Sequence, residues 1–186
     1  MNLVPSVIAV AMLAASPAIA STVTATDTLT GVARGATTVT TFNSLAASDG
    51  TGGILTLVGD GLDLGTSSNE WMDVDIDGIS LGRWECDSSP SSGGTDIPGR
   101  TGNTNCDFTL PLAISGTDLN TVLADSTADI TISFGSSVNE MSSSDFLRVT
   151  LEYNSGTPAV PLPASAWLLV AGLGMIGAAK RRRKAS

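Results

Sequence analysis

Residues 146–153 read Phe-Leu-Arg-Val-Thr-Leu-Glu-Tyr. Apolar side chains occupy every second position of this stretch, at Leu147, Val149, Leu151 and Tyr153. Successive side chains of a β-strand point to opposite faces of the sheet, so this period of two predicts a strand with one buried face. The stretch therefore favours a β-sheet whose other face meets solvent.

Short apolar runs separated by Gly, Asp, Asn and Ser clusters recur upstream and indicate further strands. The expected strands are Thr22–Thr28, Thr37–Phe42, Ile54–Val58, Glu70–Ile76, Ile79–Trp84, Cys106–Ile114, Ile130–Phe134 and Phe146–Tyr153. Between them, Leu119–Ala124 predicts one helical turn, with Thr117 or Asp118 as its cap. Strands at this spacing predict an all-β domain over residues 21–156, a two-sheet antiparallel sandwich of jelly-roll type.

Residues 71–84, Trp-Met-Asp-Val-Asp-Ile-Asp-Gly-Ile-Ser-Leu-Gly-Arg-Trp, have two interpretations. As a hairpin with an Asp77-Gly78 turn, the segment pairs Ile76 with Ile79, Val74 with Leu81, and Met72 with Arg83. In the calcium-loop interpretation, Asp73, Asp75 and Asp77 occupy the first three ligand positions of an EF-hand loop. The position of the bidentate acid, however, is taken by Trp84. The hairpin is favoured because it explains the alternation on both sides of the turn.

The hairpin register places Trp71 opposite Trp84, on the face that also carries Asp73 and Asp75. Cross-strand aromatic pairs stabilise a hairpin by up to ~1 kcal/mol, so a purely structural role accounts for the two tryptophans. The alternative is a sugar-binding platform, with indole faces for stacking and carboxylates for hydroxyl groups. These four residues are the candidate ligand face.

Cys86 and Cys106 are the two cysteines of the chain. In an exported protein such a pair favours a disulfide, here closing the Ser-, Gly- and Pro-rich loop 87–105. Closing about twenty residues stabilises the fold by roughly 3 kcal/mol in the chain-entropy model.

Charge and composition exclude several classes of function. Residues 21–160 carry four Arg against eighteen Asp and Glu, a formal charge of −14. Such a body repels phosphate backbones, so we expect no nucleic-acid partner. The chain has no His, which removes Ser-His-Asp and Cys-His catalysis and every His-ligated metal site. We predict no cofactor, no metal and no catalytic residues.

The N-terminal residues 1–20 predict a signal peptide. The apolar run 3–15 is followed by Ala18-Ile19-Ala20, the small-x-small pattern that signal peptidase reads. Cleavage after Ala20 makes Ser21 the first residue of the mature chain.

The C-terminal residues 157–186 have three parts. Residues 157–164 are Pro-rich and extended, because proline lacks an N–H donor and disfavours helix before it. Residues 164–179 lack charge and are expected to form a helix of about 24 Å, which is shorter than the ~30 Å hydrocarbon core of a bilayer. Such a short helix can still span the bilayer if the flanking cations extend their side chains to the membrane surface. Residues 180–186 begin with a stop-transfer block that stays in the cytoplasm: Lys180, Arg181, Arg182, Arg183 and Lys184.

The order of these parts resembles a family signal. The sequence Val160-Pro161-Leu162-Pro163-Ala164, a glycine-rich apolar helix and an Arg-rich end resemble the VPLPA variant of the PEP-CTERM sorting signal of Gram-negative bacteria. The resemblance implies cleavage by exosortase, a membrane-embedded transpeptidase, and an association with exopolysaccharide. The segment from Asp118 through Asn139 to Phe146 is also similar to the closing part of secreted jelly-roll domains that precede such signals.

The sequence thus predicts a protein exported through the inner membrane and anchored there transiently. Its expected partners are signal peptidase, an exosortase-like transpeptidase, the membrane and exopolysaccharide. The mature domain is expected at the cell surface or in the matrix, non-catalytic and structural or adhesive. The alternatives are a carbohydrate- or calcium-binding module, or a glycosidase using two carboxylates. An ordinary single-pass anchor is the alternative for the C-terminal segment.

Overall fold

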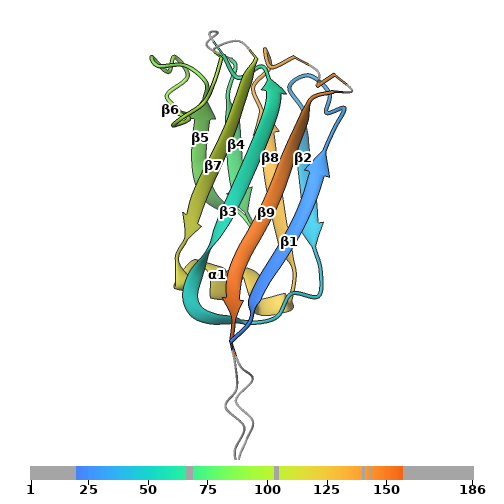
Figure 1. The fold of residues 1–186 in the computed structure, drawn as a ribbon, viewed down its shortest axis with the longest axis vertical. Coiled ribbons are helices and arrows are strands. Elements are labelled where there is room, and N and C mark those ends of the chain that lie inside the picture. The colour runs from blue at the N-terminus through green and yellow to red at the C-terminus, as the bar shows by residue number, and fades with distance from the viewer. Residues whose placement is uncertain (1–19, 66–68, 103–104, 140, 143, 157–186) are drawn as a thin grey trace, which may run out of the picture.

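The computed structural model describes residues 20–65, 69–102, 105–139, 141–142 and 144–156. Two β-sheets face each other, with one short helix at an end of the sandwich (Figure 1). The strands are β1 (Thr22–Leu29), β2 (Thr37–Phe42), β3 (Ser48–Leu62), β4 (Met72–Ile76), β5 (Ile79–Glu85), β6 (Thr95–Asp96), β7 (Cys106–Ile114), β8 (Ala128–Phe134) and β9 (Phe146–Ser155). The helix α1 (Gly116–Val122) continues into a short 3₁₀ turn, Leu123–Asp125.

The strand order confirms the predicted sandwich. One sheet has the order β1-β9-β3-β7 and the other β2-β8-β4-β5-β6. Only the connections β4–β5 and β5–β6 stay within a sheet, and every other connection crosses between the two sheets. This alternation of sheets is the jelly-roll arrangement. Apart from the parallel pair β5–β6, neighbouring strands run antiparallel.

The core lies between the sheets and is built by strand alternation. In β9, Leu147, Val149 and Leu151 are fully buried, while Arg148 and Glu152 are exposed. The facing sheet contributes Val74 and Ile76 of β4 and the inward side chains of β8. Each fully buried aliphatic side chain stabilises the fold by about 1.5–3 kcal/mol relative to exposure.

Several predicted bounds differ from the structure. β3 extends well beyond the expected Ile54–Val58, because it is a central strand paired with both β7 and β9. β6 was not predicted; it is a two-residue strand inside the disulfide loop and pairs with the end of β5. The helix begins earlier than expected, at Gly116, and its cap is Ser115, whose hydroxyl accepts from the Asp118 N–H.

The hairpin is confirmed, but half of its predicted register is wrong. Asp77 and Gly78 form the turn at positive φ, and Ile76 pairs with Ile79 as expected. A bulge then inserts one extra residue, Leu81, so that Val74 pairs with Gly82. Gly82 has φ +112, a conformation that side chains rarely adopt and that allows the bulge.

Beyond the bulge every pair is shifted by one residue. Asp73 therefore pairs with Arg83, and Met72 pairs with Trp84, instead of the predicted Met72–Arg83 pair. A one-residue slip moves side chains to the opposite face. Trp84 thus lies on the core side, and the predicted Trp71–Trp84 pair does not form.

The sandwich has two distinct ends. The described ends of the chain meet at one of them, where the Ser155 N–H donates to the Ser21 carbonyl over 2.8 Å (Figure 1). The helix α1 lies at this same end, which we call the base. At the opposite end, the loop end, the connections after β1, β3, β5 and β8 converge.

Candidate functional site

The predicted ligand face is divided between two sides of the sheet. Trp84 is partly buried and packs against the core. Trp71 and Asp73 lie on the outer side, where both are engaged by Arg83. The Arg83 guanidinium lies 3.9 Å from the Trp71 ring centroid and donates to both Asp73 carboxylate oxygens, over 2.7 and 2.8 Å. The Asp75 carboxylate makes no hydrogen bond or ion pair with the described residues.

Arg83, Trp71 and Asp73 form a group that we call the Arg83 cluster, and this cluster holds the disulfide loop against β5. Arg83 donates a further hydrogen bond to the Ser92 carbonyl, and its bond to Asp73 raises the pKa of the guanidinium. Beside it, the fully buried Glu85 carboxylate accepts from the backbone N–H groups of Ser91, Ser92 and Gly94. A buried charge is tolerated where hydrogen bonds replace its water, so this loop is fixed by polar contacts in place of an apolar core.

The disulfide between Cys86 and Cys106 is confirmed. The two Cα atoms lie 6.4 Å apart and both residues are fully buried. Cys86 directly follows β5 of one sheet, and Cys106 is the first residue of β7 in the other sheet. The bridge therefore joins the two sheets and closes the loop that Glu85 and Arg83 hold by hydrogen bonds.

The calcium-loop interpretation of residues 73–84 does not fit this geometry. Asp73 pairs with Arg83, whereas an Asp77 carboxylate oxygen accepts from the Asp129 N–H at the base. Within the described residues, no three His, Cys, Asp or Glu side chains form a group that could hold a metal ion.

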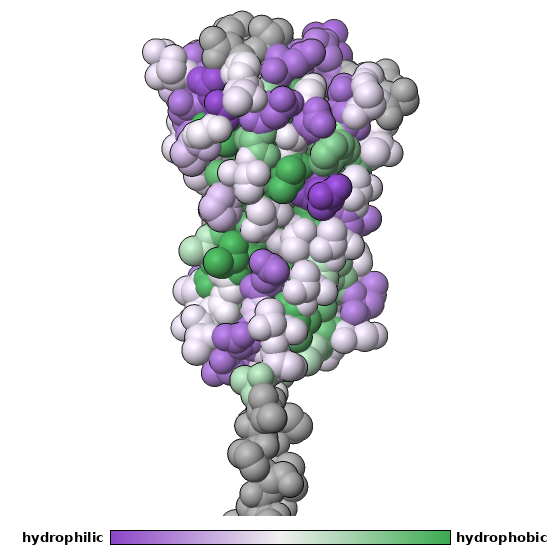
Figure 2. All heavy atoms as spheres, viewed as in Figure 1, coloured by the Kyte–Doolittle hydropathy of each residue, from purple (hydrophilic) through white to green (hydrophobic). Residues whose placement is uncertain are grey.

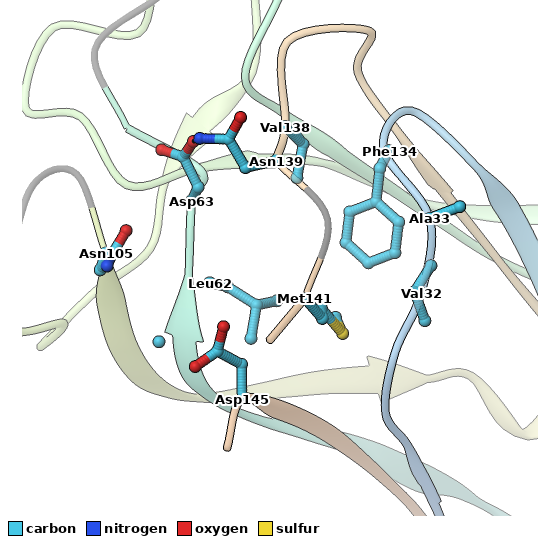
Figure 3. Close-up of a pocket in the computed structure, with 11 residues that line it drawn as sticks. Val32, Ala33, Leu62, Asp63, Asn105, Phe134, Val138, Asn139, Met141 and Asp145 are labelled. Atoms are coloured by element: carbon cyan, nitrogen blue, oxygen red, sulfur yellow. The ribbon is translucent and has the colours of Figure 1, made fainter. Parts of the chain in front are cut away.

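A cavity of about 180 Å³ lies at the loop end, between segments that are far apart in the sequence (Figure 3). Its polar lining consists of Asp63, Asn105, Asn139 and Asp145, and its apolar lining of Val32, Ala33, Leu62, Phe134, Val138 and Met141. Figure 3 shows Asp63 and Asn139 facing each other, with Val32, Ala33 and Phe134 across the cavity. The cavity is thus polar on one side and apolar on the other.

Asp63 is the most unusual residue of this cavity. It is only 7% exposed, and its Oδ2 accepts a hydrogen bond from the Asn139 amide. Its Oδ1 is buried and has no hydrogen-bond partner among the described residues. Burial, together with the nearby negative charge of Glu70, raises the pKa of Asp63. An unpaired buried carboxylate oxygen destabilises the fold, which makes this residue a candidate for a role beyond packing.

A wide, open groove of about 540 Å³ crosses the outer face of the β3–β7 sheet near the loop end. Its lining includes Val58, Asp60, Thr109 and Phe146. The Arg148 guanidinium lies 5.3 Å from the Phe146 ring centroid and is adjacent to this groove. An aromatic side chain beside a carboxylate, the combination expected at Trp71, is therefore found here.

The comparison with protein families concerns the C-terminal segment. Residues 159–184 match the model of the PEP-CTERM protein-sorting motif. The chain ends in a PEP-CTERM motif. This match confirms the family signal expected from Val160–Ala164 and the basic block, and it implies processing by exosortase. Proteins with the PEP-CTERM motif are exported and are anchored or processed at the cell surface. No curated protein and no solved structure matches the chain.

Most predicted targeting residues lie outside the described residues. This holds for Ala18, for the motif Val160, Pro161, Leu162, Pro163 and Ala164, for the apolar segment 164–179 and for Lys180–Lys184. Ser21 is described and lies at the base. In the described part of the chain, no helix has the length and apolar character needed to span a membrane.

Two features of the site were not predicted from the sequence. The Arg83 cluster depends on the bulge at Leu81, which the alternation of residues 79–84 does not reveal; Gly82 was its one local signal. The Asp63 cavity joins residues from four loops, and no spacing along the chain marks it.

Proposed function

We propose that this chain is a surface or matrix protein whose PEP-CTERM motif, of the VPLPA type, releases a structural or adhesive β-sandwich from the inner membrane. Signal peptidase cuts after Ala20, residues 164–179 hold the chain in the bilayer, and an exosortase-like transpeptidase cuts near 160–164. The observation that carries the proposal is the family match at residues 159–184, directly after a complete sandwich.

The geometry of the base supports this order of events. β9 ends at Ser155, and Val160 begins the sorting motif only four residues after Gly156. Four extended residues span at most about 14 Å, so the processing enzyme works next to the base. The loop end, with its cavity and groove, then faces away from the membrane.

The position of β9 also explains the use of a temporary anchor. β9 lies between β1 and β3, so the sheet cannot close until the last strand has crossed the membrane. The apolar segment begins nine residues after Ser155 and keeps the chain at the bilayer while this central strand pairs. Cleavage after Gly156 then leaves every strand of the sandwich intact.

The surface of the body supports a structural or adhesive role. The outer face of the β1–β9 sheet is rich in threonine, with Thr22, Thr24 and Thr26 exposed on β1 and a 3.1 Å hydroxyl contact between Thr26 and Thr150. Figure 2 shows many near-neutral residues on this face, interspersed with hydrophobic patches and single hydrophilic residues, and the hydrophilic residues are most numerous at the loop end. A hydroxyl-rich sheet face offers donors and acceptors to a hydrated polymer without requiring a cleft.

Intact-mass analysis of protein recovered outside exosortase-competent cells tests the proposal. The expected mass begins at Ser21, ends between residues 160 and 164, and is two hydrogens lower than that of the reduced chain. Replacing both Pro161 and Pro163 by Ala should leave full-length protein in the inner membrane, whereas replacing the exposed Pro111 of β7 should leave the processing unchanged. Extracellular protein that retains Trp167 would refute sorting and favour a permanent anchor.

A second candidate function is carbohydrate binding, favoured by the groove that contains Phe146 and Asp60. A sugar ring stacks on an aromatic face while its hydroxyl groups donate to carboxylates. Affinity electrophoresis in exopolysaccharide from the same cells should show retardation that Phe146→Ala removes and Trp71→Ala does not. Equal mobility with and without polysaccharide would eliminate this candidate.

A further inference from the structure

We propose that the α-amine of Ser21 is the acceptor group in the transpeptidation step, so that sorting joins the new C-terminal residue, within 160–164, to Ser21 of the same chain. The released product is then a head-to-tail circular protein. This inference rests on the proposed sorting function and names the amine that the transpeptidase uses as its second substrate. The modification site is the base, where the described ends of the chain meet (Figure 1).

The first argument is the contact between the two ends of the mature domain. The N–H and the hydroxyl group of Ser155 both donate to the Ser21 carbonyl oxygen, over 2.8 and 2.9 Å. The hydroxyl oxygens of the same two residues lie 2.9 Å apart. Ser155 is buried, whereas Ser21 is exposed, so Ser21 is fixed in place and still accessible to an enzyme. The Gly156 N–H donates to the Ala47 carbonyl over 2.8 Å, which fixes the point where the sorting segment leaves the sandwich.

The second argument is the length of the link. A cut after residue 160 leaves five residues, 156–160, between Ser155 and Ser21, and a cut after residue 164 leaves nine. Because β9 and β1 are adjacent and antiparallel, the joined segment is the loop of a β-hairpin. Hairpin loops commonly contain about two to five residues, so the link is long enough to close the ring without separating the strands.

The third argument is the supply of amines. The two lysines of the chain, Lys180 and Lys184, follow the apolar segment and leave with it, and residues 21–164 contain none. The α-amine of Ser21 is therefore the one primary amine of the mature chain. An α-amino group has an ordinary pKa of about 7.7–8.0, so roughly one in ten is neutral and nucleophilic near pH 7.

The proposed step conserves atoms and needs no oxidant or reductant. The thiol of a cysteine transpeptidase first attacks the carbonyl group at the cut, which forms a thioester and releases the apolar segment with a new N-terminus. The neutral Ser21 amine then attacks the thioester carbonyl. A C–N bond forms, the C–S bond breaks, and a proton from the amine returns to the thiolate. One peptide bond is broken and one is formed, so no water is consumed. A tethered amine is present at millimolar effective concentration, which favours it over dilute external amines.

Ring closure would protect the weakest end of the sandwich. β1 is an edge strand that pairs with β9 alone. Chain ends are where fraying and proteolysis concentrate. In the circular chain β9 continues into β1, and an exopeptidase finds no terminus to attack.

Mass spectrometry of the protein recovered outside exosortase-competent cells tests the inference. The circular chain should contain the residues expected for sorting alone and be lighter by one water. After reduction, trypsin should give a junction peptide in which residues 149–160, or up to 164, are joined to residues 21–34, because Arg148 and Arg34 are the flanking cleavage sites. Separate peptides and no lost water would overturn the inference by showing hydrolysis, and so would an added amine compound at the C-terminus; both results would leave sorting intact. Extracellular protein that retains Trp167 would instead remove sorting, and ring closure with it.

Two matched insertions between Ala20 and Ser21 test whether the base positions the amine. Ser followed by twelve Pro forms a rigid rod of about 37 Å, longer than the ~28 Å that residues 157–164 span when extended. Thirteen Gly and Ser residues form a flexible chain of the same number of residues, whose end can return to the base. The rigid insertion should reduce the yield of junction peptide at least tenfold relative to the flexible one, with equal release of both variants from the membrane. Equal junction yields would overturn the inference.

Discussion

Reducing the Cys86–Cys106 bridge should cost the folded protein about 3 kcal/mol. The two half-cystines are 20 residues apart, and in the chain-entropy model a loop of this length removes about 11 cal/mol/K from the unfolded chain. The folded state loses little on reduction, because the loop between them is also held by Glu85 and Arg83. The effect therefore lies mainly in the unfolded state. A domain of this size has a total stability of about 5–15 kcal/mol, so the change is a large fraction.

Urea unfolding of the extracellular protein, followed by tryptophan fluorescence with and without reductant, measures this contribution. Trp84 packs against the core and reports its exposure. The reduced wild type keeps both sulfur atoms, so its difference from the oxidised form isolates the cross-link. The double variant Cys86→Ala/Cys106→Ala should lose further stability, since both sulfurs are fully buried. A difference below about 1 kcal/mol between oxidised and reduced wild type would refute the reasoning, because the loop would then be equally restricted without the bond.

Two further predictions concern buried carboxylates. Glu85→Gln should lower the free energy of unfolding by about 2–3 kcal/mol, because an NH₂ group then faces backbone N–H donors. The control variant Asp75→Asn should change the free energy of unfolding by less than about 0.5 kcal/mol in the same urea assay. The pKa of Asp63 is raised in the folded chain, so between the unfolded-state pKa of 3.8 and the folded-state pKa the folded chain keeps a proton that the unfolded chain has released. In EDTA, the free energy of unfolding should therefore fall as the pH rises through this range. Asp63→Asn should therefore be more stable than the wild type at about pH 7, and the advantage should disappear below pH 3.8; an advantage of constant size across this range would contradict the assignment.

Local chemistry made much of this protein predictable. The alternation in residues 146–153 predicted β9 because a half-buried strand requires that period. Asp77-Gly78 predicted the turn because both central residues of such a turn adopt positive φ. The disulfide followed from there being two cysteines in an exported chain.

The partners of β9 and the register of the hairpin were decided by tertiary structure. β9 extends between β1 and β3, which lie more than eighty residues upstream, and its own residues do not specify these neighbours. The bulge at Leu81 turns the partly buried Trp84 toward the core and places Arg83 over Trp71, so one extra residue changes a predicted aromatic platform into a polar anchor for the loop.

The sequence by itself determined where the protein is sent, since a sorting signal is read as an extended peptide, an apolar segment and a basic end that lie in order along the chain. It also predicted the hairpin turn and every described strand except β6, because these depend on neighbouring residues. Only the tertiary structure decided the cavity around Asp63, because its lining residues come from four separate loops and the burial that leaves one oxygen unpaired exists only after both sheets have closed. Periodicity along a chain records which face of a strand is buried, but the environment of a buried charge is the sum of contacts between distant residues.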